Sequence, residues 1–99
     1  MNVKINYKLT PDAEKHLDDI YDYGLENWGE TKAELYLREL ESSFIWLGQN
    51  PELGRIRADI REEYRSWMQG SHVIFYRITS DYIEIIAVLH ERCDVVKQF

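Results

Sequence analysis

Two histidines and two arginines in the C-terminal third of this 99-residue chain have the chemistry to act on a phosphate: His72, Arg77, His90 and Arg92. Arginine stabilises phosphate charge and histidine transfers protons, so the set contains the groups of a metal-independent ribonuclease. All four residues lie on or beside two apolar segments. If these segments pair, Arg77, His90 and Arg92 would come close together, with His72 nearby.

A structural role for the same residues is commoner, because surface arginines pair with carboxylates far more often than they catalyse. The carboxylates nearest in the sequence are Glu84, Glu91 and Asp94. In this interpretation His90 caps the end of a strand. His16, on the polar face of a predicted helix, is expected to be solvated. The residues therefore favour a chain without a catalytic centre, and a nuclease is the alternative.

The two apolar segments predict the core of the fold. Val73–Ile78 and Tyr82–Leu89 are rich in β-branched and aromatic residues, and the short polar link between them indicates an antiparallel hairpin. The second segment is apolar on both strand faces, so we expect it inside the sheet, covered on both sides. Its residues Ile85, Ala87 and Leu89 should face the helices.

The preceding elements follow from periodicity and caps. Alternating apolar residues over 3–9 predict a strand, and a cap at Thr10 begins a helix that ends at Gly29. A capping box at Thr31–Glu34 predicts a second helix, which ends before Pro51. The link between the helices is so short that they must form an antiparallel hairpin. Their sheet-facing side chains are predicted to be Leu17, Ile20, Leu37, Leu40 and Phe44.

Residues 51–63 predict an ordered loop pinned by Leu53, Ile56 and Ile60, and a short strand follows at Tyr64–Met68. The chain is therefore predicted to be a single α+β domain over residues 1–99. An N-terminal strand and an antiparallel helical hairpin precede a three-stranded antiparallel meander. The helices should pack on one face of a four-stranded sheet.

Charge and composition exclude several classes of function. The net charge is −6, with eleven acidic and three basic residues in 9–54 but seven of each in 55–99. DNA binding by the chain alone is not expected, because it needs a strongly positive face. One cysteine excludes an internal disulfide and a multi-cysteine metal site, and no cofactor motif is found. No apolar run is long enough to span a bilayer and no signal-peptide pattern occurs, so we expect a cytosolic location.

Two groups of residues are candidate contacts with other proteins. The loop arginines form a basic surface suited to an acidic protein partner; they are Arg55, Arg57, Arg61 and Arg65. Trp46 lies off the apolar stripe of its helix, and an exposed tryptophan indicates a binding contact. The tail ends in Val95, Val96 and Phe99, which would pack on either a partner or the chain's own sheet.

Five longer motifs follow one another along nearly the whole chain. They are L-T-P-D-A-E, W-G-E-T-K-A-E-L-Y-L, N-P-E-L-G-R, R-S-W-M-Q-G-S-H-V-I-F-Y-R-I and I-E-I-I-A-V-L-H-E-R. In this order they resemble the ParE toxins of type II toxin–antitoxin modules, within the RelE/ParE superfamily. The resemblance covers nearly the whole chain, and its specificity comes from the combination of motifs.

The resemblance implies a cytoplasmic bacterial toxin without a cofactor, neutralised by a ParD-like antitoxin whose disordered C-terminal segment folds over it. The four loop arginines would then be antitoxin-binding residues. Free toxins of this type bind and inhibit DNA gyrase, and their modules serve plasmid stabilisation. The target-binding residues would be Trp46, Val95, Val96 and Phe99.

Related RelE-like toxins instead cut messenger RNA on the ribosome, and in that alternative Arg77, His90 and Arg92 would be catalytic. The chain departs from the nuclease pattern at two positions. His72 stands where the nucleases have an arginine, and Glu91 stands where an aromatic residue would serve them. A carboxylate at Glu91 would repel the scissile phosphate. We therefore expect a gyrase-binding toxin first, a nuclease second, and a non-toxic fold that only binds antitoxin third.

Overall fold

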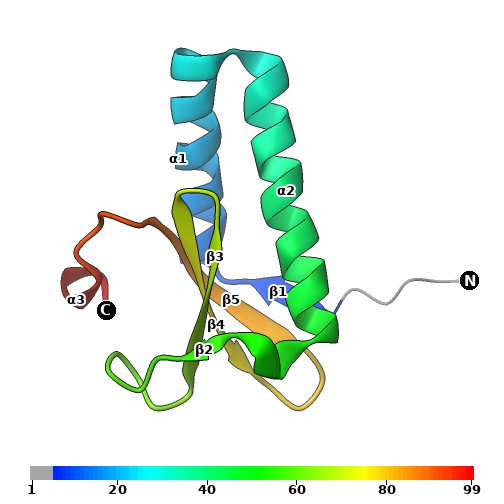
Figure 1. Ribbon diagram of the computed structural model, residues 1–99, viewed down its shortest axis with the longest axis vertical. Helices are drawn as coiled ribbons and strands as arrows, with labels where there is room; N and C mark the ends of the chain where they lie inside the picture. Colours follow the sequence, from blue (N-terminus) through cyan, green and yellow to red (C-terminus); the bar gives the residue numbers. More distant parts are fainter. Residues whose placement is uncertain (1–5) are drawn as a thin grey trace, which may run out of the picture.

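A five-stranded sheet carries a helical hairpin on one face (Figure 1). The computed structural model describes residues 6–99. Its elements are β1 (Tyr7–Leu9), α1 (Pro11–Trp28), α2 (Glu30–Gln49), the 3₁₀ turn η1 (Pro51–Leu53), β2 (Arg55–Ile56), β3 (Tyr64–Gln69), β4 (His72–Ile78), β5 (Ile83–His90) and α3 (Val95–Gln98). The strand order is β1-β5-β4-β3-β2. The predicted α+β class, helical hairpin and C-terminal meander are confirmed.

The predicted number of strands is wrong, because β2 adds a fifth. It contains only Arg55 and Ile56, which pair antiparallel with Ser66 and Arg65. A two-residue strand has no periodicity to detect. Two side chains that were predicted to pin the loop are exposed instead. Leu53 is 58% and Ile56 62% exposed, because they lie at or beside this edge strand.

The helix boundaries follow the predicted caps in α1 but not in α2. The Thr10 side chain accepts a hydrogen bond from the Ala13 amide at 3.1 Å, which begins α1. Gly29, with φ of 88°, links the helices, and this left-handed conformation favours glycine. Helix α2 begins directly at Glu30 without a side-chain cap, so the predicted capping box at Thr31 is wrong.

β5 is an interior strand, as predicted, with β1 parallel on one side and β4 antiparallel on the other. Of the predicted N-terminal strand, Tyr7–Leu9 is present, and residues 3 to 5 lie outside the described residues. The register of β5 shifts at Ile86, because Tyr76 pairs with Ile85 whereas Phe75 pairs with Ala87. The extra residue forms a β-bulge, which changes the face to which later side chains point.

Because of this bulge, the core differs from the predicted one. Ile83 and Ile85 face the helical hairpin before it, and Val88 does so after it. Ala87 and Leu89, predicted to lie under the helices, instead pack on the opposite face of the sheet. The predicted helix side chains do face the hairpin side of the sheet: Ile20, Leu40 and Phe44 are buried there, and Leu17 and Leu37 are partly buried.

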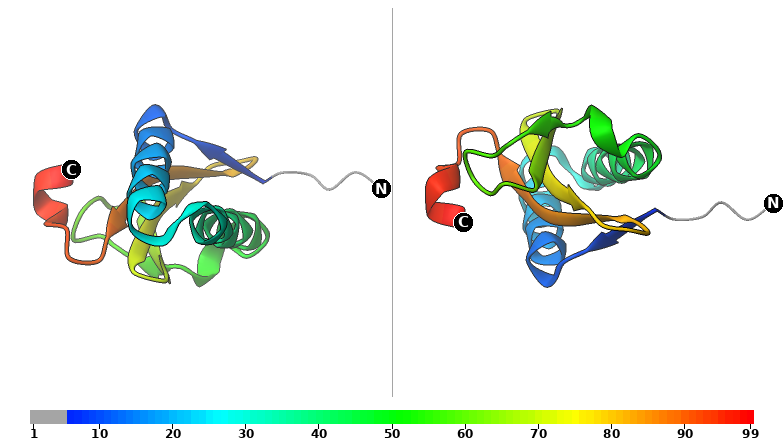
Figure 2. Two further views of the ribbon diagram at one scale, coloured as in Figure 1. Left: turned by 90° about the horizontal axis from the view of Figure 1, so that it is seen from above. Right: turned by 90° about the horizontal axis from the view of Figure 1, so that it is seen from below.

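The second face of the sheet has a smaller core of its own. Phe75, Ala87 and Leu89 are buried there, and the partly buried side chains around them are Ile60, Val73, Ile86, Cys93, Val95 and Phe99. The tail therefore closes this face. Seen along the helices, α3 lies on the opposite side of the molecule from β1 (Figure 2). None of the helices within residues 6–99 has the length and apolar character needed to cross a membrane.

Candidate binding surfaces

The structure separates the residues of the possible ribonuclease centre. Arg77 pairs with Glu84 across the β4–β5 hairpin, with Nε 2.8 Å from the carboxylate. His72 pairs with His90 at the other end of the same two strands. Five residue steps along β4 separate His72 from Arg77, a distance of about 16 Å. Arg77 therefore has the predicted structural role and does not join the histidines.

His72 belongs to a buried cluster with Tyr36. The Tyr36 hydroxyl lies 2.6 Å from Nδ1 of His72, and the rings of His72 and His90 are 5.4 Å apart. Burial, together with the nearby His90, lowers the pKa of His72 below its ordinary value of 6.5, and Glu91 opposes this shift. His72 is consequently neutral near pH 7.

His90 is exposed and caps the end of β5. Its Nδ1 accepts the Arg92 amide at 3.1 Å, and its carbonyl accepts the Cys93 amide at 2.8 Å. Arg92 itself is exposed on the turn that follows. Within residues 6–99, no group of three or more His, Cys, Asp or Glu residues is placed to hold a metal ion.

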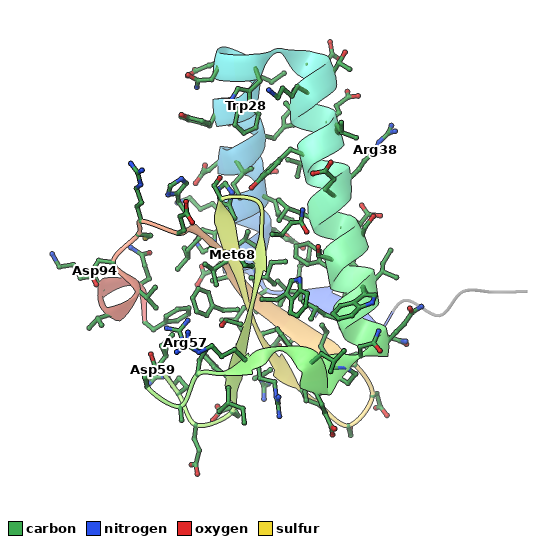
Figure 3. All side chains as sticks on the ribbon, viewed as in Figure 1. Trp28, Arg38, Arg57, Asp59, Met68 and Asp94 are labelled. Carbon is green, nitrogen blue, oxygen red and sulfur yellow. The ribbon has the colours of Figure 1, made fainter. Side chains whose placement is uncertain are left out.

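A hollow of about 480 Å³ opens beside this histidine pair, between α1 and the ends of β4 and β5. Its lining residues are His16, Asp19, Ile20, Tyr23, Trp28, Ser71, His72, Val88, Leu89 and His90. Tyr23 and Trp28 line it with their ring centres 5.9 Å apart, and Trp28 also lies 5.5 Å from Tyr36, which lines a neighbouring hollow. Figure 3 shows Trp28 high on the helical hairpin, well above the sheet. We call this hollow the aromatic pocket.

His16 has a role that the sequence analysis missed. It was expected to be solvated, but it is half-buried, and its Nδ1 accepts the Val88 amide at 3.2 Å. β1 covers β5 only up to Ile85, so the side chain of a helix takes the place of a missing strand neighbour. Because the two residues are 72 positions apart in the sequence, no local sequence pattern predicts their contact.

Arg57 is one of the two half-buried loop arginines, and its side chain is 18% exposed. Its Nη2 lies 3.0 Å from the Asp59 carboxylate, and its guanidinium carbon lies 5.4 Å from the Phe75 ring centre. Figure 3 shows Arg57 and Asp59 together in the loop beside the tail. The ion pair lowers the pKa of Asp59.

The other three arginines differ in how far the fold already uses them. Nη1 of Arg65 donates to the carbonyls of Glu52 and Gly54, both at 3.0 Å, and so holds η1 against β3. Arg61 donates to the Phe99 carbonyl at 3.5 Å. Arg55 is exposed. Arg55 is therefore the loop arginine best placed to meet a partner.

A groove of about 440 Å³ runs beside β3, next to these arginines. It is lined by Leu53, Arg55, Arg57, Ser66, Trp67, Met68 and Val73. Leu53, Met68 and the neighbouring Ile56 are among the most exposed large apolar side chains of the described residues. Apolar surface with a basic rim thus lies along the open side of β3. We call it the β3 groove.

Some of the residues predicted as contacts, in Trp46 and the tail, are exposed, and others pack against the chain's own sheet. Trp46 is partly exposed, and its ring lies 4.9 Å from that of Trp67. Phe99 packs against its own sheet, with its ring 5.3 Å from Phe75 and 5.5 Å from Tyr64. Val95 joins the same core, whereas Val96 is 85% exposed.

Comparison with known proteins decides the family. The family model described as "ParE toxin of type II toxin-antitoxin system, parDE" matches residues 7–95. The chain belongs to the ParE toxin family. Among curated ParE relatives, Toxin ParE1 of Mycobacterium tuberculosis (strain ATCC 25618 / H37Rv) is 43% identical over 90 residues, covering 90% of this chain and 92% of the relative. Toxin ParE1 of Caulobacter vibrioides is 39% identical over 85 residues, covering 86% and 88%.

A solved structure shares the ParE fold. It is described as "Chromosomal ParDE TA system from P. aeruginosa" and superposes with a TM-score of 0.74, covering 87% of this chain and 95% of that one. At 22% sequence identity, this likeness concerns the fold. The resemblance read from the motifs is thus confirmed, and the chain is the toxin type of a type II toxin–antitoxin module.

Proposed function

We propose that this ParE-family toxin acts by binding DNA gyrase in the bacterial cytoplasm, and that a ParD-like antitoxin neutralises it. The observation that carries the binding mechanism is the separation of Arg77 from the two histidines. A general acid and Arg77 cannot both reach one phosphate across about 16 Å of strand. Arg92 does lie beside His90, but the Glu91 carboxylate stands between the two in the sequence. Arg77 is also occupied by Glu84.

The surroundings of the histidines support the same conclusion. Glu91 follows His90 directly and lies close enough to His72 to affect its pKa. A carboxylate at this place repels a phosphate. For gyrase contact we propose the exposed Val96 and the partly exposed Trp46, with Val95 and Phe99 holding the tail in place from the sheet.

The antitoxin is proposed to occupy the β3 groove. Exposed Leu53 and Met68 suit the apolar side of an amphipathic segment, and Arg55 suits carboxylates on its polar side. Arg57, Arg61 and Arg65 contribute positive potential, although each also has a partner within the fold. Ordering of the antitoxin on this surface would offset part of the binding free energy.

Expression of the toxin alone tests the mechanism. We expect growth arrest with loss of gyrase supercoiling in plasmids while messenger RNA stays intact, and purified toxin should inhibit gyrase directly. The Arg92→Ala variant, which changes the arginine beside His90, should remain as toxic as the wild type. A nuclease would instead lose about 10²- to 10⁴-fold in rate with that change. Rapid messenger RNA loss with normal supercoiling would replace gyrase binding by RNA cleavage.

Charge reversal at Arg55 tests the antitoxin surface. The Arg55→Glu change should weaken antitoxin binding by about 2 kcal/mol, because a desolvated charge contact is replaced by repulsion. Lys97→Glu, the same charge change on α3 outside the groove, is the matched control and should bind normally. Equal affinities for the two variants in calorimetry would remove the β3 groove from the antitoxin interface.

A further inference from the structure

The aromatic pocket carries a charge pattern opposite to that of the β3 groove. Helix α1, which forms one wall, has six carboxylates and one lysine. Asp12, Asp19 and Glu26 are seven residues apart, so they lie along one face of the helix. Asp19 lines the pocket itself. An acidic segment of the kind proposed for the antitoxin would therefore be repelled here.

The inner surface of the pocket suits a cation of delocalised charge. The rings of Tyr23 and Trp28 touch edge to face, with centres 5.9 Å apart and planes at 84°, and so form one continuous aromatic corner. Aromatic faces attract cations, and a planar guanidinium also stacks on them. The Asp19 carboxylate at the same pocket supplies the counter-charge.

The base of the pocket adds no positive charge from His72. This imidazole is buried, hydrogen-bonded to Tyr36, and has a lowered pKa. Nδ1 of His16 accepts the Val88 amide and so carries no proton. Glu91 lies on the turn after β5, near His72. The exposed His90 also lines the pocket and Arg92 follows it on the turn, while Lys15 and Lys32 line two neighbouring hollows.

We propose that the aromatic pocket binds an arginine side chain presented by the toxin's protein target. The guanidinium would lie against the exposed Tyr23 ring, beside Trp28, and pair with Asp19. This assignment rests on the proposed function, because it supplies a contact for the target on a face that an acidic antitoxin does not suit. The pocket is also continuous with the proposed tail contact, since a neighbouring hollow shares His16, Asp19 and Leu89 with it and is lined by Phe99.

Direct binding of a small probe tests the pocket. Acetyl-arginine amide is titrated into the whole toxin and followed by NMR at the Trp28 indole and Tyr23 ring signals. The matched probe is acetyl-citrulline amide, which has nearly the same shape without the charge. We expect a saturable shift with arginine and none with citrulline. Equal shifts with both probes, or no saturable shift, would overturn the assignment.

Two adjacent aspartates on α1 provide the control variants. Asp19→Asn should weaken arginine binding about fivefold, the upper range for an exposed ion pair, whereas Asp18→Asn should leave it unchanged. Asp18 is exposed and does not line the pocket. Both variants remove one charge from the same helix, so unequal effects locate the site. An unaffected Asp19→Asn variant would contradict the proposed ion pair.

Growth arrest then links the pocket to toxicity. Asp19→Lys should reduce toxicity and keep antitoxin affinity, whereas Asp18→Lys should remain toxic. Equal losses in both variants would assign the effect to the overall charge of α1 and overturn the pocket as a target contact. A wild-type toxin that spares gyrase but binds the arginine probe through Asp19 would remove gyrase as the target and leave the arginine site standing.

Discussion

The hydroxyl of Thr10 donates a hydrogen bond to the Ile86 carbonyl at 2.9 Å, so the cap of α1 also holds the bulge of β5. The same oxygen accepts the Ala13 amide at 3.1 Å, and the Thr10 amide donates to the Ile85 carbonyl at 3.1 Å. One residue thus fixes where the first helix begins and where β5 changes face. The two cores on either side of the sheet depend on that change.

Removal of the Thr10 side chain should therefore cost more than an ordinary cap. Thr10→Ala is expected to lower the free energy of unfolding by about 2 kcal/mol, from the lost cap and the lost hydrogen bond to Ile86. Urea unfolding followed by circular dichroism measures this. Thr31→Ala is the control, because Thr31 is exposed and caps no helix, and its effect should stay within about 0.5 kcal/mol.

Phe44 is the main aromatic anchor between α2 and the sheet. It is almost fully buried, and its ring lies 5.4 Å from that of Tyr7. Phe44→Ala should cost about 3–5 kcal/mol, enough to unfold much of a domain of this size. Leu35→Ala, on the exposed side of the same helix, should change stability little. A cooperatively folded Phe44→Ala variant of wild-type stability would contradict the assigned core.

His72 should make stability depend on pH. Burial lowers its pKa in the folded state below 6.5, so the unfolded chain binds the proton more readily. The contribution of His72 is fully present above pH 6.5 and is lost as pH falls through the lower, folded-state pKa. The His72→Gln variant should lose less stability than the wild type between about pH 8 and pH 5, as measured by urea unfolding.

The neighbouring His90 offers a check on the cause of this shift. Its charge lowers the pKa of His72, but burial is the larger cause. NMR titration of the His90→Ala variant should therefore show the pKa of His72 moving up while it remains below its ordinary value. If His72 titrates at its ordinary pKa in both proteins, burial is not the cause of a lowered pKa.

Two variants in the tail should separate its effect on stability from its effect on toxicity. Phe99→Ala removes ring contacts with Phe75 and Tyr64, so it should lower the free energy of unfolding by about 1–2 kcal/mol for this partly buried ring. Val96→Ser changes an almost fully exposed side chain and should leave thermal unfolding unaltered. If Val96 contacts gyrase, this second variant should nevertheless be less toxic in growth assays.

The order of the elements was predictable from the sequence because it depends on near neighbours. Thr10 and Gly29 mark the first helix by local hydrogen bonding and backbone freedom, and the apolar run to Leu89 has the length and composition of a buried strand. The motifs also indicated the family, which the match of the family model to residues 7–95 confirms. The loop arginines could be found as a charged group, although their individual partners could not.

Register and long-range packing were decided only by the tertiary structure. The bulge at Ile86 reverses the faces of Ala87 and Leu89, and strict alternation along a strand cannot anticipate one inserted residue. The contact between Tyr36 and His72 spans 36 positions, and that between His16 and Val88 spans 72. Such contacts exist only after helix and sheet have packed, because a side chain's partner is set by the arrangement of whole elements and not by its sequence neighbours.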